Sequence, residues 1–152
     1  MVRVQLVNDE NMLRMAFSIR QKVFVEEQNV DPKLEYDEFE NISKHFVAFI
    51  DNFPVGAARW RYTDEGIKLE RFAVIADRRG KGVGSTLLKS TLENIGDPAG
   101  KQLYLHAQNQ VIPFYEKFGF EVEGGEFEEA GILHHKMTYK KESGERESGG
   151  AI

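Results

Sequence analysis

The chain has 152 residues, of which 41% are hydrophobic and 30% are charged, and it contains no cysteine. This length suits one domain with a buried core, and the composition is not that of a disordered protein. The lack of cysteine excludes disulfides, thiolate metal sites and cysteine nucleophiles. A net charge of −5 argues against a general nucleic-acid-binding protein.

The sequence predicts a protein outside the membrane. No apolar run approaches the roughly 18 residues that a membrane-spanning helix needs. Residues 1–7 are too short and too regularly alternating for a signal peptide. We therefore expect a cytoplasmic protein that binds neither nucleic acid nor a membrane. Residues 1–139 are expected to form one domain, and the charged residues 140–152, rich in Ser and Gly, a flexible tail.

A strand and a helix are predicted first. Residues 2–7 alternate apolar and polar side chains, which predicts a half-buried strand. Asn8 or Asp9 can cap the helix that follows. The apolar residues of this helix recur at helical spacing and are expected to face the core: Met12, Met15, Ala16, Ile19 and Val23.

An acidic segment at residues 26–40 allows two interpretations. It contains seven carboxylates and one lysine. Such a run can be a solvated loop or a short helix. It can also form an acidic wall beside a site for a cationic substrate.

The rest of the chain predicts strands joined by short turns and two further helices. The three strands that come first form an antiparallel meander. The predicted elements are strands at 45–50, 55–62 and 67–75, a helix at 83–95 that residues 96–100 end, a strand at 103–107, a short helix at 114–118 that begins near Pro113, and strands at 120–128 and 132–139.

A glycine-rich loop lies between the third of these strands and the second helix. Residues 78–85 read Arg-Arg-Gly-Lys-Gly-Val-Gly-Ser. Glycines let a ligand approach the backbone, and the first turn of a helix leaves N–H groups free to bind an anion. With three cationic side chains beside it, the loop suits a pyrophosphate.

Two familiar phosphate-binding motifs do not match this loop. A Walker A loop needs a lysine directly after its last glycine, where Ser85 stands. The dinucleotide fingerprint needs a different glycine spacing and a βαβ unit. The pattern Arg-x-x-Gly-x-Gly does match, through Arg79, Gly82 and Gly84. A simple turn that caps a helix is the alternative.

Three sequence blocks, at residues 69–74, 79–84 and 114–120, together resemble the GNAT N-acetyltransferase superfamily. Residues 20–28 and 131–137 look like a small bacterial subgroup, distantly similar to glyphosate N-acetyltransferase. The resemblance implies an α/β (α+β) fold of the GNAT type. That fold has a mixed, mostly antiparallel sheet of about seven strands, flanked by three or four helices, with a V-shaped cofactor cleft.

The resemblance also implies a reaction. The expected enzyme is an N-acetyltransferase that moves an acetyl group from acetyl-CoA to a primary amine by direct attack in a ternary complex. No metal and no covalent enzyme intermediate are expected. The acceptor is expected to be a small, amino-acid-like amine, and the alternatives are polyamines, protein lysines or a catalytically silent CoA-binding module. We expect a monomer or a homodimer.

The same resemblance assigns the cofactor contacts. The helix after the loop points its N-terminus at the pyrophosphate, and the strand before the loop carries a bulge that exposes its backbone to the pantetheine arm. An N–H near Val74 would polarise the thioester carbonyl. Many members have an asparagine at the position of Gln108, and either amide of residues 108–109 can serve. The implied cofactor-binding residues are Ala73, Val74, Ile75, Arg79, Gly80, Lys81, Gly82, Val83, Gly84, Ser85, Gln108 and Asn109.

The resemblance implies the general acid and leaves the general base open. Tyr115 matches the family's general acid, which protonates the departing CoA thiolate, and a core aromatic is the alternative. The general base stays open between Glu70, on the strand that leads to the bulge, and His134, in a His-x-x-Met segment. Tyr115 or an ordered water is the remaining option.

Two arginines match residues that hold the substrate's anionic end in the glyphosate relatives. They are Arg20 and Arg71, and arginine can hold a carboxylate with two hydrogen bonds. A third arginine of those enzymes falls at Gln108 here, so a doubly anionic acceptor is not expected. The alternative is that both arginines pair with the acidic residues 26–40.

Overall fold

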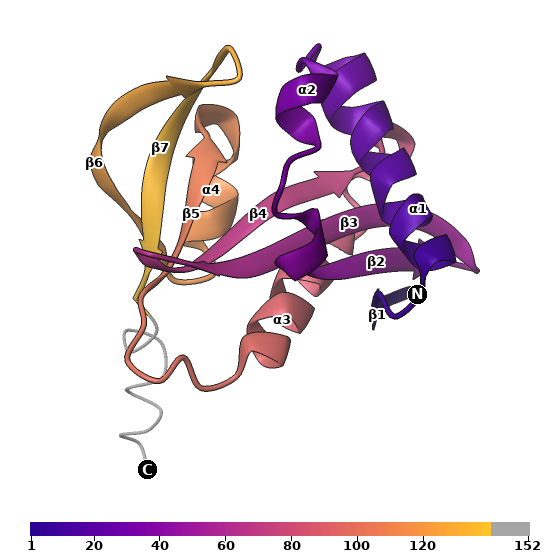
Figure 1. Cartoon of the computed structure of the whole chain (residues 1–152), viewed down its shortest axis with the longest axis horizontal. Coiled ribbons are helices and arrows are strands. Elements are labelled where there is room, and N and C mark those ends of the chain that lie inside the picture. Colours follow the sequence, from indigo (N-terminus) through magenta and orange to yellow (C-terminus); the bar gives the residue numbers. More distant parts are fainter. Residues whose placement is uncertain (141–152) are drawn as a thin grey trace. The chain divides into compact units, whose positions relative to one another are not determined.

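The computed structural model describes residues 1–140, so the tail expected at 140–152 lies outside it except for Lys140. Figure 1 shows the strands and helices. The strands are β1 (Val2–Leu6), β2 (Lys44–Ile50), β3 (Phe53–Thr63), β4 (Gly66–Val74), β5 (Leu103–Gln108), β6 (Phe120–Glu129) and β7 (Ile132–Tyr139). The α-helices are α1 (Glu10–Arg20), α2 (Pro32–Glu35), α3 (Val83–Ile95) and α4 (Ile112–Glu116). A π-helix, η1 (Gln21–Glu27), extends α1, and the 3₁₀ turns are η2 (Glu40–Ile42), η3 (Ala76–Arg78) and η4 (Asn109–Val111).

All seven strands belong to one sheet, in the order β1-β2-β3-β4-β5-β7-β6. The pairs β1–β2, β2–β3, β5–β7 and β6–β7 are antiparallel. A seven-stranded, mostly antiparallel sheet with four α-helices confirms the predicted fold class. The described residues divide into two compact units: residues 1–62 with 69–97, and residues 63–68 with 98–140.

In the first unit, α1 and α3 cover opposite faces of β2 and β3 (Figure 1). Successive strand residues point to opposite faces, which allows one strand to serve both helices. Ala57 of β3 belongs to the core cluster beneath α1 and η1. The neighbouring Gly56 lies beneath α3, where an added Cβ would be 2.9 Å from the side chains of Val83 and Leu87. The absence of a side chain at Gly56 therefore lets α3 approach the sheet closely.

Helix α1 begins as predicted, but the face that it buries is narrower than the predicted apolar face. Asp9 caps it by accepting a hydrogen bond from the Met12 N–H at 2.8 Å. Ala16 and Ile19 are buried, whereas Met15 is 36% exposed, so the prediction of Met15 as core was wrong. Met15 lies about 100° around the helix from Ala16, and the small Ala16 marks the centre of the contact with the sheet.

In the second unit, α4 packs against one face of a sheet made of β5, β7 and β6. Tyr115 of α4 contacts the ring of Phe120, which in turn contacts Tyr139. Phe120 and Tyr139 are register partners, so these rings share one face of the sheet. Side chains alternate between the two faces along each strand. His106 of β5 and His134 of β7 therefore lie on the opposite face of this sheet.

The helices of residues 1–140 include none that is long and apolar enough to span a membrane.

Gly66 provides a test of the fold in the second unit. It begins β4 at a φ of +141°, and an added Cβ would overlap the carbonyl oxygen of Gln102. Ile67 donates its N–H to that same oxygen at 2.8 Å. Gly66→Ala should therefore break this link and lower the free energy of unfolding by about 2 kcal/mol or more, measured by urea denaturation.

The matched control is Gly125→Ala in β6. Gly125 has an ordinary φ and no atom within 4 Å of the added Cβ, so its free energy of unfolding should change by less than about 0.5 kcal/mol. Equal effects of the two substitutions would contradict the described conformation of Gly66.

Candidate active site

The glycine loop, residues 79–84, leads into the N-terminus of α3. Gly82 precedes the helix in a left-handed conformation, φ +84°, which a side chain would strain. No atom lies within 4 Å of the position of a Cβ at Gly80 or Gly82. The first helical bond runs from the Thr86 N–H to the Gly82 carbonyl at 3.1 Å. The N–H groups of residues 82–85 therefore have no partner within the helix and can face an anion.

Arg79 is held in place by two other segments of the first unit. Its two Nη atoms contact the carboxylate of Glu27, at the end of η1, at 2.8 and 2.7 Å. Its Nε donates to the carbonyl of Val74 at 2.9 Å. The mutual hydrogen bonds raise the pKa of Arg79 and lower the pKa of Glu27. Glu27 neutralises Arg79, and Arg78 lies 3.3 Å from the Asp77 carboxylate, so the cationic charge available to an anion at this loop comes from Lys81.

The peptide between Val74 and Ile75 is fixed from both sides. Arg79 holds its carbonyl, and its N–H, on Ile75, donates to the Val55 carbonyl of β3 at 3.0 Å. The C=O and N–H of a trans peptide point in opposite directions, so the Val74 carbonyl points away from β3. In an extended chain the N–H of Val74 points to the same side as its own carbonyl. The N–H of Val74 therefore points away from β3.

Strand β4 is irregular at Arg71, whose φ is +59°. Glu70 and Arg71 are consecutive, yet both side chains reach the same group of charged residues. A regular strand would point them to opposite faces, so this is the geometry of a β-bulge. The family resemblance implied such a bulge in this strand.

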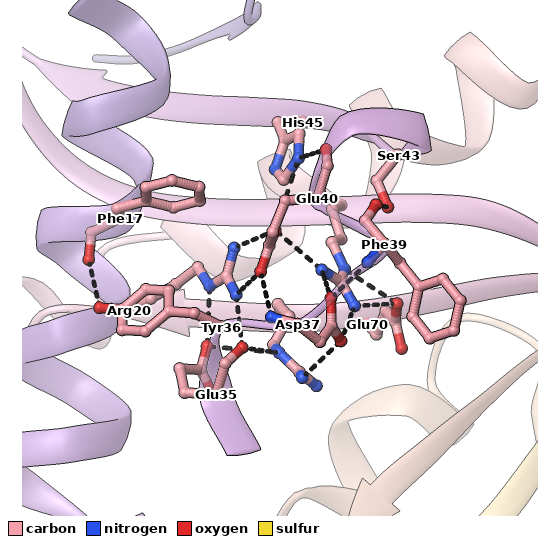
Figure 2. Close-up of polar contacts among 12 residues, drawn as sticks. Phe17, Arg20, Glu35, Tyr36, Asp37, Phe39, Glu40, Ser43, His45 and Glu70 are labelled. Atoms are coloured by element: carbon pink, nitrogen blue, oxygen red, sulfur yellow. Dashed lines mark hydrogen bonds and ion pairs between the residues drawn. The ribbon is translucent and has the colours of Figure 1, made fainter. Parts of the chain in front are cut away.

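Eight charged side chains meet over β3 and β4 in what we call the buried ion-pair cluster. Figure 2 labels five of its members: Arg20, Glu35, Asp37, Glu40 and Glu70. At its centre Arg59 is 0% exposed. It contacts Asp37 at 2.8 Å, Glu40 at 2.8 Å and Glu70 at 2.6 Å. The members are Arg20, Glu35, Asp37, Glu40, Arg59, Arg61, Glu70 and Arg71.

The cluster changes the interpretation of the acidic segment. Glu35, Asp37 and Glu40 turn inward, so the prediction of a solvated segment was wrong for them, although the short helix α2 does form. Inward-facing arginines neutralise these carboxylates. With four arginines and four carboxylates, the ionised cluster has no net charge to attract a cation. An acidic wall for a cationic substrate would therefore have to form without the three central carboxylates of the segment.

Burial and ion pairing act in opposite directions on these carboxylates. Burial raises the pKa of Glu35 above its ordinary value despite the nearby charges of Arg71 and Arg20. Burial alone would also raise the pKa of Asp37, but hydrogen bonds and charge from Arg59 outweigh it and hold the pKa at about 2. Burial also acts to raise the pKa of Glu40, but the hydrogen bonds and charge of Arg20, with the charge of Arg59 and the Asp37 N–H, together outweigh it and lower the pKa.

The predicted substrate arginines both pair with the acidic segment. Arg20 is 1% exposed and donates to the Glu35 and Glu40 carboxylates and to the Glu35 carbonyl, at 2.7 to 3.0 Å. Arg71 uses Nε and Nη2 for the Leu34 and Glu35 carbonyls and for Asp37. Its side chain is 17% exposed, and its Nη1 makes no hydrogen bond to any described residue. Arg71 thus retains donors for a ligand, whereas Arg20 is enclosed.

Glu70, one of the two predicted bases, is also part of the cluster. Its Oε2 lies 2.8 Å from Arg59 Nε and 2.6 Å from Arg61 Nε. A carboxylate that accepts a proton beside two guanidinium ions works against their charge. These contacts favour a structural role for Glu70.

Tyr115, the predicted acid, is buried in the second unit. Its ring contacts Phe114 at 5.1 Å and Phe120 at 5.9 Å between centroids. Burial raises the pKa of Tyr115 above its ordinary value. The hydroxyl is therefore protonated at neutral pH, as a general acid requires.

His134, the other predicted base, has a fixed tautomer. Its Nδ1 lies 2.7 Å from the carbonyl oxygen of Ile132. A carbonyl only accepts, so Nδ1 carries the hydrogen, and Nε2 of the neutral ring carries the lone pair. The ring stacks on Phe127 at 5.8 Å. His134 can therefore accept a proton at Nε2.

The two amides proposed for the cofactor differ in their contacts. Asn109 is bound at both ends: it donates to Glu126 at 2.7 Å and accepts from His135 Nδ1 at 2.8 Å. The side-chain oxygen of Gln108 accepts from Gln110 at 2.6 Å. A contact of Asn109 with a ligand would have to replace one of these bonds.

Sequence reasoning missed the centre of the buried ion-pair cluster. Arg59 and Arg61 stand at alternate positions of a strand and therefore share the face of the buried Ala57. Inward arginines in a strand need carboxylate partners, and the acidic segment at 26–40 is the nearest dense source. That combination was the signal in the sequence that could have identified the cluster.

Asp37 should make the free energy of unfolding depend on pH. A carboxylate whose pKa is lowered on folding stabilises the fold above its unfolded pKa, near 3.8, and loses this contribution as the pH falls toward 2. Asp37→Asn should therefore cost about 2 kcal/mol at pH 7. The difference from wild type should shrink as the pH falls from 4 to 2, measured by urea denaturation at each pH. Asp64→Asn in an exposed turn is the control, and a difference for Asp37→Asn that does not vary with pH would contradict the assignment.

Comparisons with known proteins agree with this geometry. The family model described as an acetyltransferase (GNAT) domain matches residues 8–141. The uncharacterized N-acetyltransferase YjcF of Bacillus subtilis (strain 168) is 41% identical over 137 residues, which cover 90% of this chain and 98% of the relative.

Solved structures share the fold. The crystal structure of Escherichia coli ElaA superposes with a TM-score of 0.81 at 29% identity, covering 91% of this chain and 99% of the other. A GNAT family acetyltransferase from Elizabethkingia anophelis, solved with acetyl-CoA bound, gives a TM-score of 0.68 at 16% identity, covering 91% and 97%. At that identity the likeness shows the fold alone. The family match and the relatives over nearly the whole chain identify this protein as a member of the GNAT acetyltransferase family.

Proposed function

We propose that this protein transfers an acetyl group from acetyl-CoA to the primary amine of a small, amino-acid-like acceptor, by direct attack in a ternary complex. The observation that carries the proposal is the open, left-handed Gly82 at the N-terminus of α3 in a chain of this family. It supplies free backbone N–H groups to an anionic ligand at the place where the family binds the pyrophosphate of its cofactor.

Backbone N–H groups and a charged side chain would share the binding of acetyl-CoA. The N–H groups of residues 82–85 would hold the pyrophosphate, with Lys81 adding charge. The N–H of Val74, which points away from β3, would polarise the thioester carbonyl. Arg79 would act by fixing the Val74 carbonyl, since Glu27 already takes its charge.

Tyr115 and His134 are the proposed acid and base. The raised pKa of Tyr115 keeps a proton ready for the departing thiolate. His134 holds a lone pair at Nε2, whereas Glu70 contacts two guanidinium groups. These contacts favour His134 as the base. Assigning the loop and these two residues to one reaction rests on the family resemblance.

The acceptor class rests on Arg71. It is partly exposed and keeps Nη1 for a ligand, which suits an acceptor with one carboxylate. The positions of Arg20, Arg71 and the His-x-x-Met segment support the distant likeness to glyphosate N-acetyltransferase. The third arginine of those enzymes is absent, because Gln108 stands at its position. A polyamine is less favoured, because arginines neutralise three central carboxylates of residues 26–40.

Gly84→Glu should abolish CoA binding by the loop. Gly84 lies in the first turn of α3, where a glutamate stabilises the helix but repels a pyrophosphate. The affinity for CoA, measured by calorimetry, should fall by more than about 10-fold, or 1.4 kcal/mol. Gly84→Ala is the control and should bind CoA nearly as wild type. Unchanged binding by Gly84→Glu would remove the loop from the site.

Tyr115→Phe should impair the chemistry and leave binding intact. The change keeps the ring packed and removes the hydroxyl, so kcat should fall by about 10²-fold with CoA affinity near wild type. The measurement is CoA release over a panel of amino acids, polyamines, aminoglycosides and lysine peptides. Tyr62→Phe, at an exposed position of β3, is the control. A normal kcat in Tyr115→Phe would exclude Tyr115 as the acid.

The same panel separates the alternatives. Turnover of polyamines or lysine peptides with no turnover of amino acids would contradict the proposed acceptor class. CoA binding without release of CoA for any amine would indicate a catalytically silent module.

A further inference from the structure

A second histidine lies beside His134 on the face of the second unit opposite α4. His106 of β5 is in register with Lys136, and His134 of β7 is in register with Gln108. The two histidines are therefore diagonal neighbours on the same face. Phe127 of β6 contacts both rings, with centroids at 5.0 Å from His106 and 5.8 Å from His134.

Glu129 fixes the tautomer of His106. The Nδ1 atom of His106 lies 2.9 Å from Oε1 of Glu129. This hydrogen bond lowers the pKa of Glu129, which is therefore an acceptor at neutral pH. Nδ1 must then carry the hydrogen, and Nε2 of the neutral imidazole carries the lone pair. His106 and His134 thus share one tautomer although different acceptors fix it.

We propose that His106, oriented by Glu129, is a second general base of this enzyme. The inference rests on the proposed function, because it concerns the proton that a primary ammonium must lose before it can attack a thioester. In the step, one N–H bond of the ammonium breaks and an Nε2–H bond forms on His106, while Nε2 of His134 would accept the second proton, which the nitrogen loses after its attack. The amine keeps the electron pair for attack, and the imidazolium that results faces the Glu129 carboxylate. Glu129 is a positioning residue.

The charges around His106 fit this role. Glu129 is the carboxylate that contacts the ring among the described residues. Lys136 is paired with Glu65 at 2.9 Å and with Glu123 at 3.6 Å. Lys68 and His134 lie close enough to Glu129 to lower its pKa further. The carboxylate therefore stays ionised and can stabilise a positive charge on the imidazole.

Exposure distinguishes this pair from a structural one. The side chains of His106 and Glu129 are 24% and 39% exposed, so an acceptor can reach the ring. A surface ion pair of this kind contributes only about 0–1 kcal/mol to stability. The ring of His106 is therefore more accessible to an acceptor than that of His134, which is 7% exposed.

Kinetics test the proposal once an amine that supports CoA release is in hand. His106→Gln should lower kcat/KM by about 10²-fold or more while CoA affinity is unchanged. Glu129→Gln should shift the acidic limb of the kcat/KM profile to lower pH, because the imidazolium loses its carboxylate and the neutral base persists in more acidic solution. Glu128→Gln, the exposed neighbour, should leave the profile unchanged. A purely structural role would lower activity without moving the limb, and that result would overturn the proposal.

A second measurement does not depend on the acceptor. The chain has only four histidines, so nitrogen NMR of histidine-labelled protein can assign each tautomer. His106 should carry its hydrogen on Nδ1 in wild type and lose this preference in Glu129→Ala, while His134 keeps its tautomer in both. A hydrogen on Nε2 of His106 in wild type would overturn the proposal. If wild type shows the expected tautomers but releases CoA with no amine, the proposed function fails while the geometry of His106 stands.

Discussion

The guanidinium of Arg59 is the interaction on which the first unit most depends. It is fully buried, and it joins three carboxylates that come from the acidic segment and from β4. Removing one partner of a buried ion pair costs about 3–5 kcal/mol, because the remaining charge is left without compensation. Arg59 therefore fixes residues 35–40 against the sheet, and with them the surroundings of Arg71 at the bulge of β4.

The charged and polar groups of the chain differ in what they contact in each region. The buried ion-pair cluster uses its charges internally, and Arg71 is the most exposed of its four arginines. The glycine loop relies on backbone N–H groups, since Glu27 neutralises Arg79. The second unit holds a buried tyrosine whose pKa is raised by burial and two histidines with lone pairs at Nε2. In the proposed function, anion binding, scaffold and proton transfer thus belong to different elements of the chain.

Local patterns predicted the fold well, whereas contacts between distant segments were harder to predict. The strand alternation, the Asp9 cap, Pro113 at the start of α4 and the glycines that end α3 are signals read within a few residues. The inward turn of Glu35 and Glu40 depends on Arg20 and Arg59, which lie up to 20 residues from their partners, so charge content alone suggested a solvated segment. The tautomer of His106 likewise depends on a carboxylate 23 residues further along. Spacing identifies a candidate histidine, but only the fold supplies its partner.

The most direct test of the account is mass spectrometry of acceptors after incubation of the wild-type protein with acetyl-CoA and the amine panel. The account predicts that at least one small amine with a single carboxylate gains one acetyl group, with an equal amount of CoA released. It also predicts that this product is absent without the protein. Binding of acetyl-CoA with no acetylated amine of any class would contradict it.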